Sequence, residues 1–159
     1  MPFIQTRDNQ RVYVRDIGTQ TASSQPPIFL LHGFGMQSAH WLPFAYPLSK
    51  QHRFIIPDFR GFGRSHTQNH NEACVISNYA HDLADIIQHY GFTQIKLAGI
   101  SMGAFIALQY QSIYGDQHVA RYLHIDQSPK CLNNSNWRWG LFGNEQVQRL
   151  ERAQALIEE

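Results

Sequence analysis

Residues 98–104 read AGISMGA and place Ser101 between two glycines, Gly99 and Gly103, directly after the mostly apolar run that begins at Ile95. The run is typical of a short buried strand, and the next residues, FIALQYQSIY, have the pattern of a helix. A serine hydroxyl lifted clear of a sheet requires a strained turn, and side chains two positions away on either side would collide with the adjoining helix and strand. The stretch therefore predicts a strand-turn-helix unit with Ser101 as a nucleophile.

Apolar runs elsewhere predict the neighbouring strands. Ile28–Leu31 and Phe54–Ile56 are continuous apolar runs, which are typical of interior strands in a parallel sheet. VARYLHID, residues 119–126, predicts one further strand after a helix at 102–114.

Helical patterns occupy the intervals between these strands. Residues 77–91 carry apolar side chains at helical spacing, with Ser77 placed to cap the start and Gly91 the end. Residues 40–50 predict a short helix, although Pro43 and Pro47 do not suit a helix interior.

The amino-terminal residues predict a β-hairpin, because residues 3–7 and 11–16 alternate apolar and polar side chains on either side of Asp8-Asn9. The expected fold is α/β, with a mostly parallel sheet, helices on both faces and an antiparallel hairpin at the start. Ligands of such folds bind at the carboxyl ends of the strands.

A second glycine-rich segment, His32-Gly33-Phe34-Gly35, leaves the strand at 28–31 at that edge. An oxyanion formed at the serine needs backbone N–H donors from two directions. The Phe34 amide is the predicted donor from this segment, and the Met102 amide, at the start of the helix, is the other. His32 is expected to brace the segment through a hydrogen bond.

The segment PDFRGFGRS, residues 57–65, leaves the next strand at the same edge. Its glycines, Gly61 and Gly63, permit a tight turn, and Asp58 and Arg60 are expected to hydrogen-bond to loop backbone. A structural role is therefore favoured over a catalytic one.

Composition restricts the partners and cofactors. Thirteen Lys and Arg residues balance twelve Asp and Glu residues, with no block of either sign, so neither a nucleic-acid groove nor an anionic membrane surface is expected. The two cysteines, Cys74 and Cys131, have no zinc or redox spacing and are expected to remain unpaired. No metal or cofactor is predicted. The start of the chain lacks the pattern of a secretion signal and no run approaches a membrane span, so the expected location is the cytoplasm.

The motifs HGFG, DFRGFGRS and GISMG together resemble the α/β-hydrolase family over the whole chain. The resemblance implies that Ser101 is the nucleophile of acyl transfer and that the Phe34 and Met102 amides form the oxyanion hole. A serine at the turn, in place of aspartate, favours esterases, lipases, carbon–carbon bond hydrolases and cofactor-free haloperoxidases or perhydrolases.

The family supplies its triad in the order Ser, Asp or Glu, then His, and the chain reaches Glu159 before the strands that carry the last two. His118 is expected at the opposite edge of the sheet, and His124 inside a strand. His66 and His70 follow a strand predicted two positions from that of Ser101, about 10 Å away at about 4.8 Å per strand. None of these histidines is favoured as the base.

Asp126 ends the strand beside that of Ser101, and some members of the family place their acid after this strand. The alternative, a cap for the following loop QSPK, is the favoured interpretation.

Residues 127–159 differ in composition from residues 1–126, which form the predicted core. They comprise an aromatic loop and an amphipathic helix started by Asn144, with Val147, Leu150, Ala153 and Ile157 on one stripe. The resemblance implies the beginning of a lid. Trp137 and Trp139 are equally compatible with lining an apolar pocket and with ordinary packing.

Two functions follow. The first is a serine hydrolase of small esters or related carbonyl compounds, of which this chain is an amino-terminal portion lacking the triad histidine. The second is an incomplete hydrolase-like chain that binds a small ligand or partner and self-associates through its uncovered sheet edge or helix stripe.

Overall fold

The computed structural model describes residues 2–18, 25–65 and 75–158. It divides into two compact units, Met1–Asp126 and Gln127–Glu159. The first unit holds a six-stranded sheet, and the second holds a loop and a helix.

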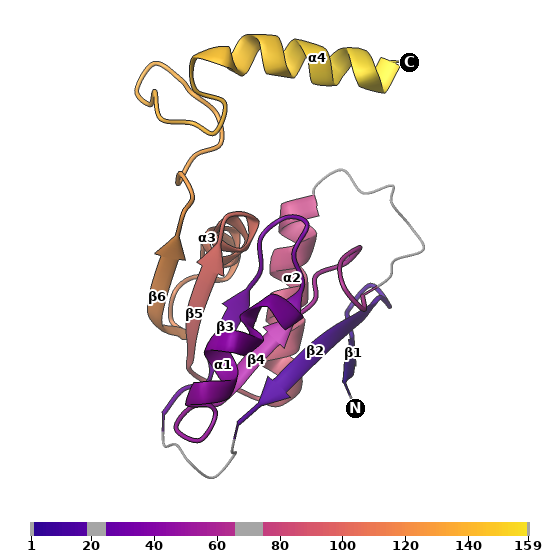
Figure 1. Ribbon diagram of the computed structural model, residues 1–159, viewed down its shortest axis with the longest axis vertical. Helices are drawn as coiled ribbons and strands as arrows, with labels where there is room; N and C mark the ends of the chain where they lie inside the picture. Colours follow the sequence, from indigo (N-terminus) through magenta and orange to yellow (C-terminus); the bar gives the residue numbers. More distant parts are fainter. Residues whose placement is uncertain (1, 19–24, 66–74, 159) are drawn as a thin grey trace. The chain divides into compact units, whose positions relative to one another are not determined.

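The sheet of the first unit has the order β1-β2-β4-β3-β5-β6 (Figure 1). Its strands are β1 Phe3–Gln5, β2 Arg11–Ile17, β3 Ile28–Leu31, β4 Phe54–Pro57, β5 Ile95–Ile100 and β6 Val119–Ile125. The pairs β4–β3, β3–β5 and β5–β6 are parallel, whereas β1–β2 and β2–β4 are antiparallel. The predicted fold class, a mostly parallel sheet opened by an antiparallel hairpin, is confirmed.

β1 is shorter than the predicted strand at residues 3–7 because the turn begins at Thr6. The Thr6 N–H donates to Gln10 O at 2.9 Å, and the Thr6 hydroxyl donates to Asp8 Oδ1 at 2.5 Å. Asn9 takes up the left-handed conformation of the turn, with φ of 64°.

Helices cover both faces of the sheet (Figure 1). A 3₁₀ turn, Ser38–Trp41, leads into α1 Leu42–Leu48 on one face, and α2 Val75–Tyr90 and α3 Met102–Tyr114 lie on the other. Pro43 is tolerated because it stands in the first turn of α1, where the amide needs no intrahelical acceptor.

The start predicted for α2 is wrong. Ser77 lies inside the helix, not at its cap, and its hydroxyl accepts a hydrogen bond from Gln109 Nε2 at 3.1 Å. Gly91, in contrast, ends the helix as predicted: its φ of 67° lets the Gly91 and Phe92 N–H groups reach the last carbonyls of α2.

The core has two layers because successive strand side chains point to opposite faces. On β3, Leu31 packs with the cluster beneath α2 and α3, and Leu30 packs with the cluster beneath α1. The close packing fixes the carboxyl ends of β3, β4 and β5, which carry the three glycine-rich segments.

In the second unit, a loop is followed by a 3₁₀ turn, Gly143–Glu145, and by α4 Gln146–Glu158. The Asn133 side chain organises the loop: its Oδ1 accepts from the Gly140 N–H at 2.6 Å and its Nδ2 donates to Gly143 O at 2.6 Å. Asn144 lies within the 3₁₀ turn, so the predicted cap is displaced from the start of α4. Val147 and Leu150, from the predicted apolar stripe, are exposed within this unit.

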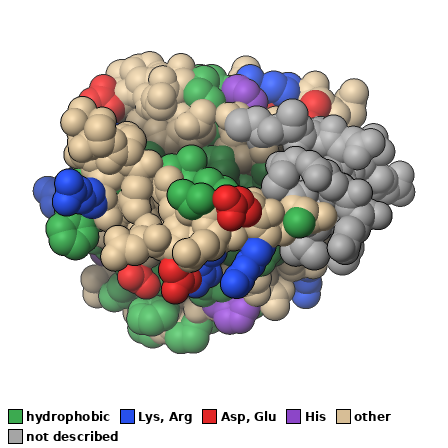
Figure 2. All heavy atoms as spheres, turned by 90° about the horizontal axis from the view of Figure 1, so that it is seen from above, with side chains coloured by type: hydrophobic (Ala, Val, Ile, Leu, Met, Phe, Trp, Pro, Cys, Tyr) green, Lys and Arg blue, Asp and Glu red, His purple; other side chains and the backbone are tan. Residues whose placement is uncertain are grey.

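Across the described ranges, none of the helices has the length and apolar character that a bilayer span requires. The same residues contain no group of three metal-binding side chains. Both basic and acidic side chains are visible in Figure 2.

Candidate active site

Ser101 lies on the turn between β5 and α3, at φ 50° and ψ −119°. A positive φ is uncommon outside glycine, costs about 1–3 kcal/mol, and persists only where the surrounding structure imposes it. The Ser101 N–H donates to Ile125 O at 3.1 Å and ties the turn to the end of β6. Ser101 is thus held in a strained conformation at the carboxyl edge of the sheet.

The flanking glycines permit the turn. A Cβ atom at Gly99 would lie 2.4 Å from the Gly103 carbonyl oxygen, and a Cβ at Gly103 would lie 2.3 Å from that of Leu31. Both contacts are with backbone, which cannot rotate away. The glycines therefore let α3 start directly against β3 and β5.

The HGFG segment packs against this turn. A Cβ atom at Gly33 would lie 3.4 Å from the Ser101 Cβ. The Met36 N–H donates to Gly33 O at 3.2 Å, which closes a tight turn, and Gly35 supplies the positive φ of 73° inside it.

His32 fixes the orientation of the Gly33–Met36 turn through hydrogen bonds of its buried ring. It is fully buried; its Nδ1–H donates to Gly33 O at 2.8 Å, and its Nε2 accepts from the Phe59 N–H at 3.0 Å. These partners assign the proton to Nδ1. In a trans peptide the C=O and N–H point in opposite directions, so a Gly33 carbonyl directed at His32 directs the Phe34 N–H away from it.

Burial lowers the pKa of His32 below its ordinary value of 6.5, because the charged imidazolium is poorly solvated there. Below pH 6.5, His32 becomes protonated in the unfolded chain but stays largely neutral in the folded chain until the pH reaches its lower folded-state pKa. The free energy of unfolding should therefore fall as pH decreases through 6.5, by at most about 1.4 kcal/mol per pH unit from this group. We expect the free energy of unfolding, measured in urea, to decrease less between pH 7.5 and 5.5 for His32→Gln than for the natural chain. Equal decreases would show that buried, neutral His32 does not contribute to the acid sensitivity.

Asp126 directly follows Ile125, the residue whose carbonyl accepts the Ser101 N–H. Its φ is 48°, so it adopts a left-handed conformation, and it is exposed. The backbone of Asp126 is thus adjacent to the strained serine turn at the carboxyl end of β6.

The described histidines after Ser101 have other partners. His118 Nδ1 donates to Thr93 O at 3.0 Å, beside the amino-terminal end of β5. His124 Nδ1 lies 2.7 Å from the Tyr122 hydroxyl, which donates to Ala104 O at 3.0 Å; burial raises the pKa of Tyr122 to about 12. His66 and His70 lie outside the described residues.

Asp58 organises the DFRGFGRS loop as predicted. Its carboxylate accepts from the Ser38 N–H at 2.5 Å and the Arg64 N–H at 2.9 Å. A Cβ atom at Gly63 would lie 2.3 Å from Asp58 Oδ2, so this arrangement requires glycine there.

Arg60 differs from the prediction because its guanidinium binds carboxylates of other elements. Its guanidinium donates to Asp82 of α2 at 2.7 and 2.5 Å and to Asp8 of the hairpin turn. Asp82 is fully buried, and burial raises its pKa to about 6 in spite of Arg60. The cluster connects the loop to α2 and to the hairpin. Asp8 and Asp82 lie 52 and 22 residues from Arg60 in the sequence, so no local sequence pattern indicates these contacts.

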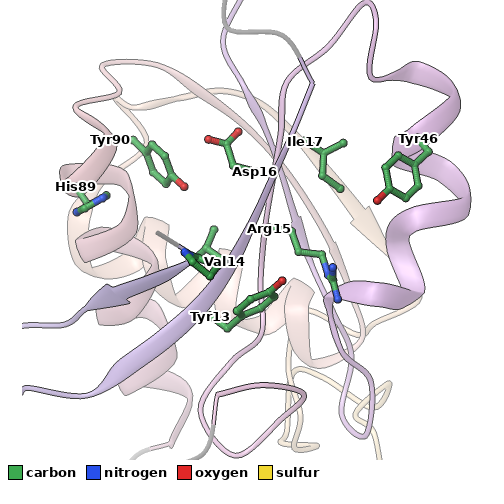
Figure 3. A pocket seen from close by; sticks show the side chains of 9 residues that line it. Tyr13, Val14, Arg15, Asp16, Ile17, Tyr46, His89 and Tyr90 are labelled. Carbon is green, nitrogen blue, oxygen red and sulfur yellow. The ribbon is translucent and has the colours of Figure 1, made fainter.

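Two pockets in the described residues lie away from Ser101. One, of about 450 Å³, is beside β2, with Tyr46 of α1 and His89 and Tyr90 of α2 at its walls (Figure 3). The other, of about 310 Å³, lies between α2 and α3 and includes Tyr110 and Tyr114. Neither contains a residue of the predicted site.

Trp137 and Trp139 belong to the second unit. Trp139 is 77 % exposed, whereas the Trp137 indole N–H is buried and finds no acceptor among the described residues. Lys130 Nζ lies 5.9 Å from the centre of the Trp137 ring. Their role in a substrate pocket stays a prediction.

The α/β-hydrolase-fold family matches residues 26–156, and the chain belongs to this family. Among curated relatives, it is 28 % identical over 133 residues to a non-heme haloperoxidase of Rhodococcus erythropolis, which covers 83 % of this chain and 46 % of the relative. It is 29 % identical over 119 residues to a pimeloyl-[acyl-carrier protein] methyl ester esterase of Pseudoalteromonas atlantica, covering 75 % of this chain and 44 % of the relative.

The chain is also similar to solved structures of esterases. An esterase from Exiguobacterium antarcticum has 28 % identity and a TM-score of 0.75, over 97 % of this chain and 55 % of the esterase. A thermophilic esterase from Thermogutta terrifontis has 27 % identity and a TM-score of 0.71, over 82 % of this chain and 47 % of the esterase. The chain spans about half the length of these relatives.

Proposed function

We propose that the protein containing this chain is a serine hydrolase of small esters or related carbonyl compounds, with Ser101 as its nucleophile. The strained backbone of Ser101 at the carboxyl edge of the sheet supports this most directly. The names of the relatives, among them two esterases of known structure, favour the same reaction class.

In the proposed mechanism, Ser101 Oγ attacks the ester carbonyl and its proton passes through a base to the departing alcohol. The acyl group remains bonded to Oγ until water attacks it, which releases the acid and restores the hydroxyl. We propose a histidine as this base; His118 and His124 have the partners described above, and His66 and His70 lie outside the described residues.

The Phe34 and Met102 amides are proposed as the oxyanion hole. Met102 is the first residue of α3, so its N–H has no intrahelical acceptor. The Phe34 N–H is directed by the Gly33 carbonyl and hence by His32. Both donors would then face the carbonyl oxygen as it gains negative charge.

Asp126 is the candidate acid in this chain, and a purely structural role for it remains the alternative. The Asp126→Asn substitution removes the carboxylate that would orient a base. Asparagine has nearly the same size as aspartate and tolerates the φ of 48° at this position. As the acid, Asp126→Asn should lower kcat/KM for a short ester by about 10³-fold or more while the melting temperature stays constant. Retained activity in Asp126→Asn would assign Asp126 to the turn alone.

Residues 127–159 are proposed as the start of a lid, with Trp137 and Trp139 contributing an apolar surface. The competing proposal is a binding chain without catalysis. β6 ends the described sheet and Leu123 on it is 58 % exposed, which favours self-association in that case.

Hydrolysis of p-nitrophenyl acetate and butyrate by the natural protein separates the two proposals. A hydrolase turns over both esters repeatedly, and a binding chain turns over neither. A rate equal to the buffer rate, together with concentration-dependent association, would favour the binding chain.

A further inference from the structure

Phe34 has a conspicuously exposed apolar ring. Its 80 % exposure is the largest of any bulky apolar side chain in the described part of residues 1–126. It directly follows Gly33, the residue that lies against Ser101. An apolar ring is therefore presented to solvent one residue from the contact with the candidate nucleophile.

The local fold does not require an aromatic residue at this position. The hydrogen bond from Met36 to Gly33 closes the turn, and Gly35 carries its positive φ. The proposed oxyanion donor at Phe34 is a backbone amide, which any residue except proline supplies. Burial does not explain the ring either, since most of its surface lies outside the core.

The ring is nevertheless held in position. Phe62, from the DFRGFGRS loop, contacts it in an edge-to-face arrangement, with centroids 5.5 Å apart and an interplanar angle of 80°. Phe62 is itself half-buried and packs at 5.4 Å from the His32 ring and 6.5 Å from the Tyr79 ring. The exposed ring of Phe34 is thus anchored to the core through Phe62.

We propose that the Phe34 side chain determines specificity by binding a flat apolar group of the substrate, an aryl ring. The proposal rests on the function proposed above. An aryl group gains edge-to-face or offset contact with a positioned ring and loses hydrated apolar surface.

The test measures binding of phenylacetone and 2-butanone, two ketones that resemble esters but are not hydrolysed. Dissociation constants are determined by ligand-observed NMR titration of the natural protein. We expect phenylacetone to bind more tightly than 2-butanone, and Phe34→Ala to weaken phenylacetone binding about tenfold while 2-butanone binding changes less than twofold.

Phe44→Ala is the matched control. Phe44 is 66 % exposed and also has one edge-to-face partner, Trp41 at 6.1 Å, but it lies on α1. Its substitution should leave phenylacetone binding unchanged. Equal phenylacetone affinity in the natural protein and Phe34→Ala, or no preference for phenylacetone over 2-butanone, would overturn the proposal.

These experiments distinguish failure of the aryl-site proposal from failure of the hydrolase proposal. Phe34-dependent phenylacetone binding without any ester hydrolysis would retain the aryl site and reject the hydrolase. Hydrolysis of p-nitrophenyl acetate with phenylacetone binding that is independent of Phe34 would retain the hydrolase and reject the aryl site.

Discussion

Replacing Ser101 with alanine should reduce ester hydrolysis by the natural protein by about 10⁴-fold or more, because no other group then forms the acyl intermediate. The loss should appear in kcat, since substrate binding does not require the hydroxyl. Ser135→Ala, at an exposed loop position of the second unit, is the control and should retain full activity. Substantial activity in Ser101→Ala would exclude Ser101 as the nucleophile.

A second substitution at Ser101 tests whether its backbone is strained. At φ 50° and ψ −119°, alanine retains the strain of serine, whereas glycine relieves it. We expect Ser101→Gly to be more stable than Ser101→Ala by about 1 kcal/mol in urea unfolding, after the entropy cost of glycine. Equal stability of the two variants would show that the turn stores no strain in the backbone of this residue.

Arg60→Met should produce the largest loss of stability. It leaves the fully buried Asp82 without the guanidinium that hydrogen-bonds both of its oxygens. Breaking a buried ion pair from one side costs about 3–5 kcal/mol. We expect a loss of this size at pH 7.5, measured by urea unfolding with circular dichroism.

The pH dependence identifies the cause of that loss. The pKa of buried Asp82 is already raised to about 6, and removing Arg60 raises it further. A folded-state pKa above the unfolded value means that the folded state gains stability as pH falls and Asp82 binds a proton. The deficit of Arg60→Met should therefore shrink at pH 5.5.

Arg64→Met is the control from the same loop. Arg64 is exposed; its guanidinium contacts Tyr13 through a 3.2 Å hydrogen bond and lies 4.9 Å from the ring centre. Its loss should cost about 1 kcal/mol or less. Equal losses for the two variants would show that the carboxylate cluster is not the main attachment of the loop.

Local sequence patterns predicted the strand-turn-helix units well. β3 and α3 have the predicted bounds, because an apolar run and a helical stripe each identify one element without reference to the rest of the chain. The family's motifs also identified the candidate serine. The exposed, anchored ring of Phe34 was missed, since its contact with Phe62 joins two loops that are 28 positions apart.

Contacts between distant segments and short capping interactions were harder to predict. The sequence predicts that Arg60 binds loop backbone, yet its guanidinium binds Asp8 of the hairpin and Asp82 of α2, which only the tertiary fold brings together. The sequence pattern predicts caps at Ser77 and Asn144, but Ser77 lies inside a helix and Asn144 inside a 3₁₀ turn, because capping residue types also occur within helical segments.

Reaction of the natural protein with a fluorophosphonate probe tests the central claim most directly, because the probe bonds to serines that a nearby base activates. Intact mass and peptide mapping then report the number and the position of adducts. We predict a single adduct on Ser101, absent from Ser101→Ala. Natural protein that stays unlabelled, or that carries its adduct on another serine, would contradict the assignment of Ser101 as the nucleophile.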